Sequence, residues 1–151
     1  MKTTLGRIAL VATLSLLAIP SAASAAPTLW GGSGFNDLGP AYALLSAQNG
    51  RASVTNVQLI MACTDTQDGT ESSRAFDARF RNRVALRRNR FSFGFSAISN
   101  GRLGWVRLTG TLGSNGRGSA VVDVEATATG DEGAVIERCN GRARIQLRRG
   151  R

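Results

Sequence analysis

The alternation of hydrophobic and polar positions is clearest over residues 91–112. Three phenylalanines there alternate with serine and glycine, which is the two-residue period of a half-buried strand. Asn100-Gly101 follows, and this dipeptide favours a two-residue type I′ turn. Such a turn places each phenylalanine opposite a residue of the next strand: Phe95 with Val106, Phe93 with Leu108, and Phe91 with Gly110. The sequence therefore predicts a central β-hairpin.

The same alternation predicts strands in the rest of the chain. The predicted segments are residues 42–45, 54–63, 76–86, 122–129 and 136–147, separated by glycine-rich or polar turns. No long stretch has a 3.6-residue apolar period. We therefore expect an all-β domain over residues 41–151, an antiparallel β-sandwich or flattened barrel of about seven strands. Residues 26–40 are rich in glycine and proline and are predicted to form a flexible leader, with one short strand near Leu29-Trp30.

The length of the loop within residues 113–119 determines which residues of the two flanking strands lie opposite each other. Val122, Val124 and their alternate neighbours form the apolar set of the following strand. A two-residue loop would mix the two faces, whereas an odd-length loop with glycine in the left-handed position keeps them apart. We expect such a loop, with Leu108 opposite Val124 and an exposed cross-strand ion pair between Arg107 and Glu125.

Residues 1–25 have the pattern of an export signal. Lys2 and Arg7 precede an uncharged apolar run, and Ala23-Ser24-Ala25 supplies the small residues that signal peptidase requires. The run is too short for a membrane-spanning helix, which needs about 20 residues. We expect cleavage near Ala25-Ala26 and a secreted, monomeric chain without a transmembrane segment.

The two cysteines, Cys63 and Cys139, are expected to form a disulfide, since exported chains usually pair their cysteines. The alternative is a pair of free thiols that act as nucleophile or metal ligands. Cys63 falls on the predicted inward face of its strand, so we expect the bridge to span the core and to hold the middle of the domain to its last strand.

The composition excludes most catalytic chemistry. The chain contains no histidine, and Lys2 is its only lysine, which removes Ser-His, Cys-His and lysine-based mechanisms and the common zinc sites. Asp123 and Glu125 are the remaining carboxylate pair for acid–base work, although an exposed pair beside arginines is more simply a solvated surface. We predict a non-enzymatic protein without a cofactor.

Two charged segments are candidate binding sites. The loop at 65–71 offers Asp65, Asp68 and Glu71 as weak calcium ligands, without the spacing of an EF-hand. The second segment is a run of arginines that could bind anionic polysaccharide or cell-wall polymer: Arg79, Arg81, Arg83, Arg87, Arg88 and Arg90. Alternation predicts the first three on one strand face. The alternative is a solvated edge that opposes aggregation. We do not expect sequence-specific nucleic-acid binding, because few aromatic residues lie among these arginines.

From Gly50 onward, the chain resembles a group of uncharacterised small exported actinobacterial single-domain β-sandwich proteins with one disulfide. The shared segments are G-R-A-S-V-T-N-V, A-C-T-D, N-R-F-S, G-T-L-G-S-N-G-R-G-S and R-C-N-G-R-A-R. The resemblance implies a single exported sandwich in which Cys63 pairs with Cys139, and it implies no catalytic residue. Ile145 stands where the group often has an aromatic residue, which departs from a shared aromatic ligand site.

These observations lead to three functional hypotheses. The first is a secreted binding or cell-surface interaction module, which could engage anionic polymer through its arginines. The second is an inhibitor of secreted hydrolases that presents an exposed loop, at residues 64–73 or 113–119. The third is a glycan hydrolase that depends on the Asp123 and Glu125 carboxylates.

Overall fold

The computed structural model describes residues 26–150, and every regular element within this range is a β-strand. The strands are β1 (Thr28–Asn36), β2 (Gly39–Gln48), β3 (Arg51–Asp65), β4 (Glu71–Arg79), β5 (Arg83–Ala85), β6 (Arg90–Ser99), β7 (Arg102–Leu112), β8 (Arg117–Thr129) and β9 (Val135–Arg149). The predicted antiparallel all-β fold is confirmed, with nine strands instead of about seven. The two additional strands arise because residues 28–36 are a strand and because residues 76–86 are divided between β4 and β5.

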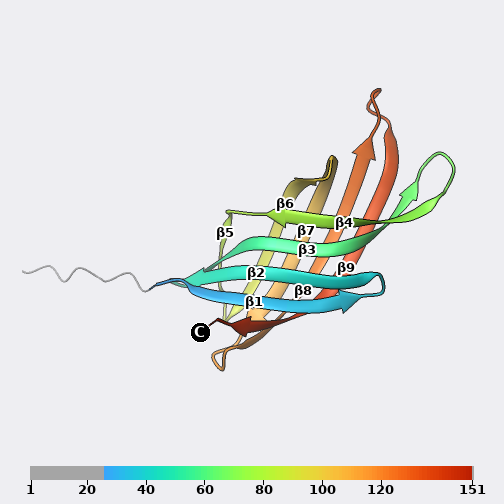
Figure 1. The fold of residues 1–151 in the computed structure, drawn as a ribbon. Helices are drawn as coiled ribbons and strands as arrows, with labels where there is room; N and C mark the ends of the chain where they lie inside the picture. The colour runs from blue at the N-terminus through green and yellow to red at the C-terminus, as the bar shows by residue number, and fades with distance from the viewer. Residues whose placement is uncertain (1–25, 151) are drawn as a thin grey trace, which may run out of the picture.

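The strands form one sheet that folds over itself into two layers. Its order is β4-β3-β2-β1-β9-β8-β7-β6, and Figure 1 shows β1–β4 crossing in front of β6–β9. β9 is long enough to pair with β8 on one side and with two strands on the other. Its second half pairs with β1, and its first half pairs with β3. The sheet is thereby closed along this side, as in a flattened barrel.

The core lies between the two layers and consists of the inward side chains of both. Phe76 on β4 and Phe93 on β6 are among the largest fully buried residues. The predicted hairpin of β6 and β7 has the expected register, with Phe93 opposite Leu108. Asn100 and Gly101 have φ values of 51° and 75°, which are the positive angles that a type I′ turn requires.

The prediction of a flexible leader over residues 26–40 is wrong, because β1 lies between β2 and β9 in the sheet. Gly32 and Gly34 face inward where the sheet bends from one layer to the other. A Cβ atom on Gly34 would lie 1.7 Å from the carbonyl oxygen of Arg144 on β9, and one on Gly32 would lie 2.1 Å from that of Gln146. The glycines therefore allow a close approach of two backbones, which is a packing role.

The loop between β7 and β8 has the predicted odd length, but the register differs by two residues. Gly113 N–H donates to the Arg117 carbonyl at 2.8 Å, and Gly116 between them has a φ of 76°. This three-residue loop pairs Leu108 with Val122 and Arg107 with Asp123. The predicted pairs Leu108–Val124 and Arg107–Glu125 are therefore wrong. Alternation assigned the inward and outward faces of β8 correctly, but it did not fix the position of the turn, which sets the register.

Side chains of the β6–β7 turn connect the open edges of the two layers. The Ser99 hydroxyl accepts the backbone N–H of Asp77 at 3.1 Å, and the Asn100 amide donates to the Ala75 carbonyl at 3.1 Å. Phe80, just after β4, contacts Phe95 of β6 with 3.6 Å between ring centroids. These contacts close the side of the barrel opposite β9 without a continuous backbone ladder.

The predicted signal peptide and its cleavage site near Ala25-Ala26 lie at or beyond the start of the described residues. Within residues 26–150 there is no helix long and apolar enough to cross a membrane.

Candidate functional site

The predicted arginine run is divided among three places in the structure. Arg79 ends β4 and Arg83 begins β5, both beside β3, while Arg81 lies in the irregular link between them. Arg87 and Arg88 form a tight turn, and Arg90 begins β6 in the other layer. The predicted single stripe is interrupted because β4 ends at Arg79 and residues 80–82 are outside any strand.

A larger set of arginines lies on the outer face of β6–β9, which we call the arginine face. Its exposed arginines come from all four strands: Arg90, Arg107, Arg117, Arg138, Arg142, Arg144 and Arg148. Asp123 and Glu125 are the acidic residues on the same face. Seven positive charges against two negative charges give this face a net charge of +5.

Residues opposite one another in paired strands share a face, so the side chains of the arginine face lie in rows that cross the strands. Ser92, Thr109, Val121 and Arg144 form one such row, and the rows on either side place Gln146 and Arg142 next to Arg144 on β9. Neighbouring strands are about 4.8 Å apart, and alternate residues on one strand are about 7 Å apart. The strands thus set the spacing of the backbone positions from which the guanidinium groups project.

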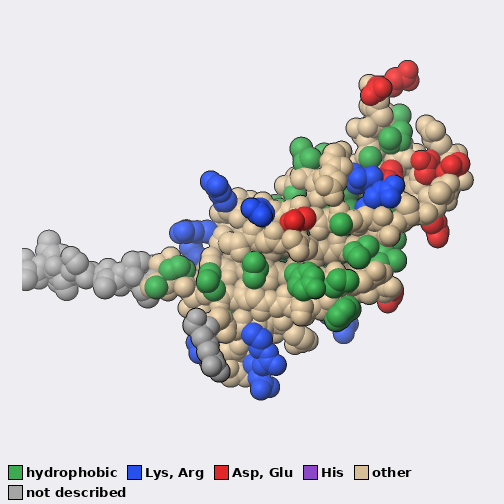
Figure 2. All heavy atoms as spheres, viewed as in Figure 1, with side chains coloured by type: hydrophobic (Ala, Val, Ile, Leu, Met, Phe, Trp, Pro, Cys, Tyr) green, Lys and Arg blue, Asp and Glu red, His purple; other side chains and the backbone are tan. Residues whose placement is uncertain are grey.

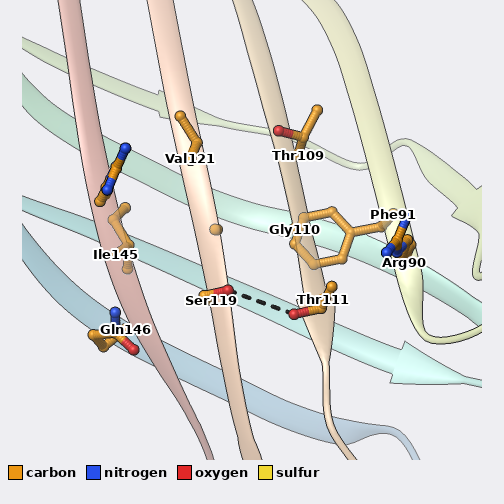
Figure 3. A pocket seen from close by; sticks show the side chains of 11 residues that line it. Arg90, Phe91, Thr109, Gly110, Thr111, Ser119, Val121, Ile145 and Gln146 are labelled. Carbon is orange, nitrogen blue, oxygen red and sulfur yellow. Dashed lines mark hydrogen bonds between the residues drawn. The ribbon is translucent and has the colours of Figure 1, made fainter.

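A shallow hollow on this face extends across the four strands, from Arg90 on β6 to Gln146 on β9 (Figure 3), and Arg144 also lines it. Thr111 and Ser119 line its floor, and their hydroxyls are 3.5 Å apart. Hydroxyl groups can both donate and accept hydrogen bonds, and the two guanidinium groups supply only donors. The arrangement is suited to the oxygen atoms of an anionic group.

The predicted carboxylate pair lies in the middle of the arginine face. Arg142 Nε is 3.3 Å from Asp123 Oδ1, and the two side chains are 71% and 40% exposed respectively. Arg107 is directly opposite Asp123 on β7. Asp123 is thus paired with a cation on the outer face of the sheet, as in the alternative of a solvated surface.

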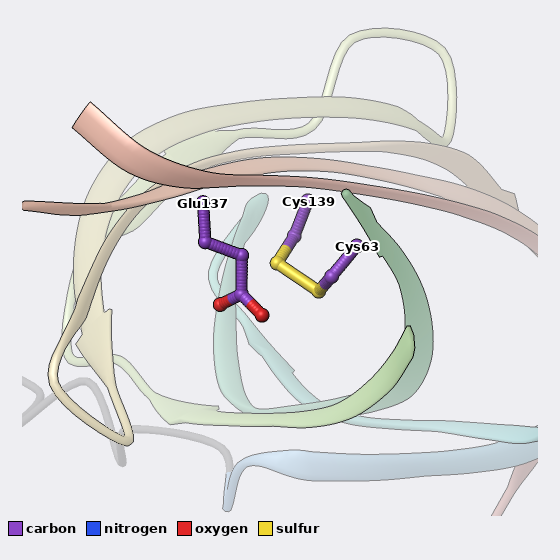
Figure 4. A group of neighbouring side chains, drawn as sticks. All are labelled: Cys63, Glu137 and Cys139. Carbon is purple, nitrogen blue, oxygen red and sulfur yellow. A yellow bond between two sulfur atoms is a disulfide. The ribbon is translucent and has the colours of Figure 1, made fainter. Parts of the chain in front are cut away.

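A second charged group lies at one end of the interior, beside the disulfide (Figure 4). Glu137 Oε2 is 2.5 Å from Arg102 Nη2, and its Oε1 is 3.4 Å from Arg74 Nε. These three residues come from β9, β7 and β4 respectively, so the ionic group links the two layers. The burial of Glu137 and its links across the layers make this group a structural element of the fold.

Cys63 and Cys139 form the predicted disulfide, and they lie directly opposite each other in the β3–β9 pair. The expectation of a bridge that spans the core is wrong, because the two strands are adjacent. Cys63, Glu137 and Cys139 are the one group of three potential metal ligands that converge within 4.8 Å among residues 26–150. Sulfur atoms joined to each other are not thiolates, so this group has no metal-binding chemistry in the oxidised protein.

The candidate calcium loop is a turn that is tied to the start of β9, where the Thr66 N–H donates to the Ile136 carbonyl at 2.9 Å and its hydroxyl donates to the Val135 carbonyl at 2.7 Å. Asp65 Oδ1 accepts the N–H groups of Gln67 and Asp68, and Asp68 Oδ1 accepts that of Thr70 at 2.8 Å. Hydrogen bonds from Thr70 lower the pKa of the Asp68 carboxyl below 3.8. Asp65, Asp68 and Glu71 do not converge as a set of metal ligands in the described part of the chain, so the geometry gives no support to the calcium prediction.

Alternation within β9 places Arg142, Arg144 and Arg148 on its solvent side. The register of β7, β8 and β9 brings them onto one face with Arg107 and Arg117. The inward position of Glu137 follows from alternation, because Glu137 lies two residues before Cys139, which faces inward.

No protein-family description, curated protein or solved structure is found to match this chain, so the resemblance inferred from the sequence stays a prediction.

Proposed function

We propose that this chain is an exported, non-catalytic binding module that holds anionic polymers on its arginine face. The observation that carries the proposal is the net charge of +5 on the outer face of β6–β9, spread over four paired strands. A repeating anion can contact several of these guanidinium groups at once, and each contact releases counterions. Export is supported by the disulfide and by the signal-like pattern of residues 1–25.

The arginine face suits a polymer better than a single small anion. Its hollows are shallow and open, so a small ligand would keep most of its surface in water. Arginine also binds sulfate, phosphate and carboxylate groups in a bidentate manner, which lysine does not. We therefore expect binding to depend on the charge density of the polymer and to fall with salt.

The test is a titration of labelled heparin and labelled polyphosphate with residues 26–151, followed by fluorescence anisotropy at 50 to 400 mM NaCl. If four arginines contact the polymer, a slope of about −0.7 per contact predicts roughly 50-fold weaker binding at 200 mM than at 50 mM salt. Both polymers are expected to bind, because the arginine face recognises charge.

Two triple variants with equal loss of charge separate a surface from net charge alone. The first changes Arg107, Arg144 and Arg148 to Ser, and the second changes Arg79, Arg81 and Arg83 to Ser. We expect the first to lose binding and the second to retain most of it. Equal losses in both variants, or no binding by the unmodified chain at 50 mM salt, would refute the proposal.

A further inference from the structure

The opposite outer face, on β1–β4, carries a groove of a different chemical character. Two rows of side chains cross these four strands. One row runs Ser33, Tyr42, Gln58, Asp77, and the next runs Gly31, Leu44, Asn56, Arg79. Most of these residues line the groove, together with Thr55. Figure 2 shows this face, where exposed hydrophobic side chains gather over β1 and β2.

Asp77 organises the two amide side chains of the groove. Its Oδ1 accepts from Asn56 Nδ2 at 2.9 Å, and its Oδ2 accepts from Gln58 Nε2 at 3.0 Å. Each amide keeps a carbonyl oxygen and a second N–H for a ligand. A ligand that binds here meets donors and acceptors already held in place, which lowers the entropy cost of binding.

The backbone opens the groove at the same point. β3 has a bulge at Thr55, because Leu44 pairs with Asn56 while Leu45 pairs with Val54. The Thr55 hydroxyl donates to the Leu44 carbonyl at 2.9 Å, which fixes the bulge. Bulges redirect side chains and are frequent beside binding sites. On β1, Gly31 has no side chain and Ser33 has a short one, so neither residue fills the neighbouring part of the groove.

The contents of the groove favour an uncharged ligand with many hydroxyl groups. Asp77 and Arg79 contribute opposite charges, so the two rows carry no net charge. Tyr42 is 45% exposed and Leu44 is 53% exposed, and they form an apolar strip beside the amides. A pyranose ring has an apolar face that can lie on an aromatic side chain, and its edge carries hydroxyls that bond to amides and carboxylates.

We propose that the groove lined by Tyr42, Leu44, Asn56 and Gln58, with Asp77 beside it, binds a neutral oligosaccharide. Its apolar ring face lies against Tyr42 and Leu44, and its hydroxyls bond to the two amides and to Asp77. The four strands span about 14 Å, which accommodates two or three sugar rings. This site lies in the layer opposite the arginine face and does not depend on the proposed binding of anionic polymers.

The experiment is isothermal titration of residues 26–151, at 500 mM NaCl, with four neutral hexasaccharides. The probes are β-1,4-linked and β-1,3-linked glucose, β-1,4-linked mannose and β-1,4-linked N-acetylglucosamine, each up to 5 mM. We expect at least one to bind with a Kd below 1 mM. High salt suppresses binding through the arginine face, so the two proposals can fail separately.

Variants then locate the site. Tyr42→Ala and Asp77→Ala are each expected to weaken binding at least ten-fold, while Tyr42→Phe retains it. The matched control is Trp105→Ala, which removes an exposed aromatic side chain from the outer face of β6–β9. Heteronuclear NMR spectra verify that each variant is folded and should show ligand-induced shifts on β2–β4. Binding to none of the probes, or equal losses in Tyr42→Ala and Trp105→Ala, would overturn the proposal.

Discussion

Replacement of Glu137 by glutamine tests whether the ionic group at the end of the barrel holds the two layers together. The Glu137 side chain is 11% exposed and that of Arg102 is 17% exposed, so most of their water has been removed. Breaking a fully buried ion pair by removing one partner costs about 3–5 kcal/mol. Arg102 keeps a hydrogen bond to the Asn100 carbonyl at 3.1 Å, and glutamine can still accept one hydrogen bond.

We therefore expect Glu137→Gln to lower the free energy of unfolding by about 2–3 kcal/mol. For a domain of this size, that corresponds to a fall in Tm of roughly 8–12 °C. Arg74 adds little to the estimate because its side chain is 46% exposed and solvent screens it. Urea unfolding monitored by circular dichroism measures the difference directly.

The exposed pair of Asp123 and Arg142 provides a matched control. Asp123→Asn should cost less than about 1 kcal/mol, since water screens both charges in the folded protein. A double variant, Arg102→Met with Glu137→Leu, removes both buried charges and should recover most of the stability. The reasoning is refuted if Glu137→Gln and Asp123→Asn have the same effect within about 0.5 kcal/mol, which is a typical additivity error.

Two further predictions concern the disulfide and the loop at 65–71. Changing Cys63 and Cys139 to Ala should lower the free energy of unfolding in urea by about 4.5 kcal/mol, because the bridge closes a loop with a sequence separation of 76; a loss below about 1 kcal/mol would contradict this entropic estimate. The lowered pKa of Asp68 means that its contribution to loop stability is present above pH 3.8 and is lost as the pH falls through the lowered value. Carboxyl carbon NMR should show that Thr70→Val, which removes the hydroxyl hydrogen bond and keeps the backbone one, moves the midpoint of Asp68 back towards 3.8; an unchanged midpoint would show that the Thr70 hydroxyl is not a cause of the shift.

The parts of the fold that depend on local pattern were predictable from the sequence. The β6–β7 hairpin is the clearest case, because alternation sets its faces and Asn100-Gly101 sets its turn. The role of β1 was not predictable in this way. Glycine in a sequence indicates freedom of the backbone, whereas Gly34 is required by the approach of β9, which comes much later in the chain.

In the candidate sites, too, the sequence pattern predicts which residues face solvent but not which of them lie close together. Alternation alone indicates that Arg144 and Arg148 face solvent, but their proximity to Arg107 follows from the order of the strands. The groove on β1–β4 combines residues from four strands and a bulge, and no contiguous motif marks it. Asp77 in particular is an isolated acid in the sequence and gains its significance from the two amides that it holds.

The position of β9 has a consequence for the order in which the protein folds. This strand follows the other eight in the chain, yet it joins β8 to β1 and to β3. Until residues 135–149 have joined the sheet, β1 has an unpaired edge and the two layers have no common strand. Contacts this distant in sequence make folding slow, and unpaired edges promote aggregation in the meantime. Completion of the fold is therefore a late event, which occurs when β9 inserts between β1 and β8.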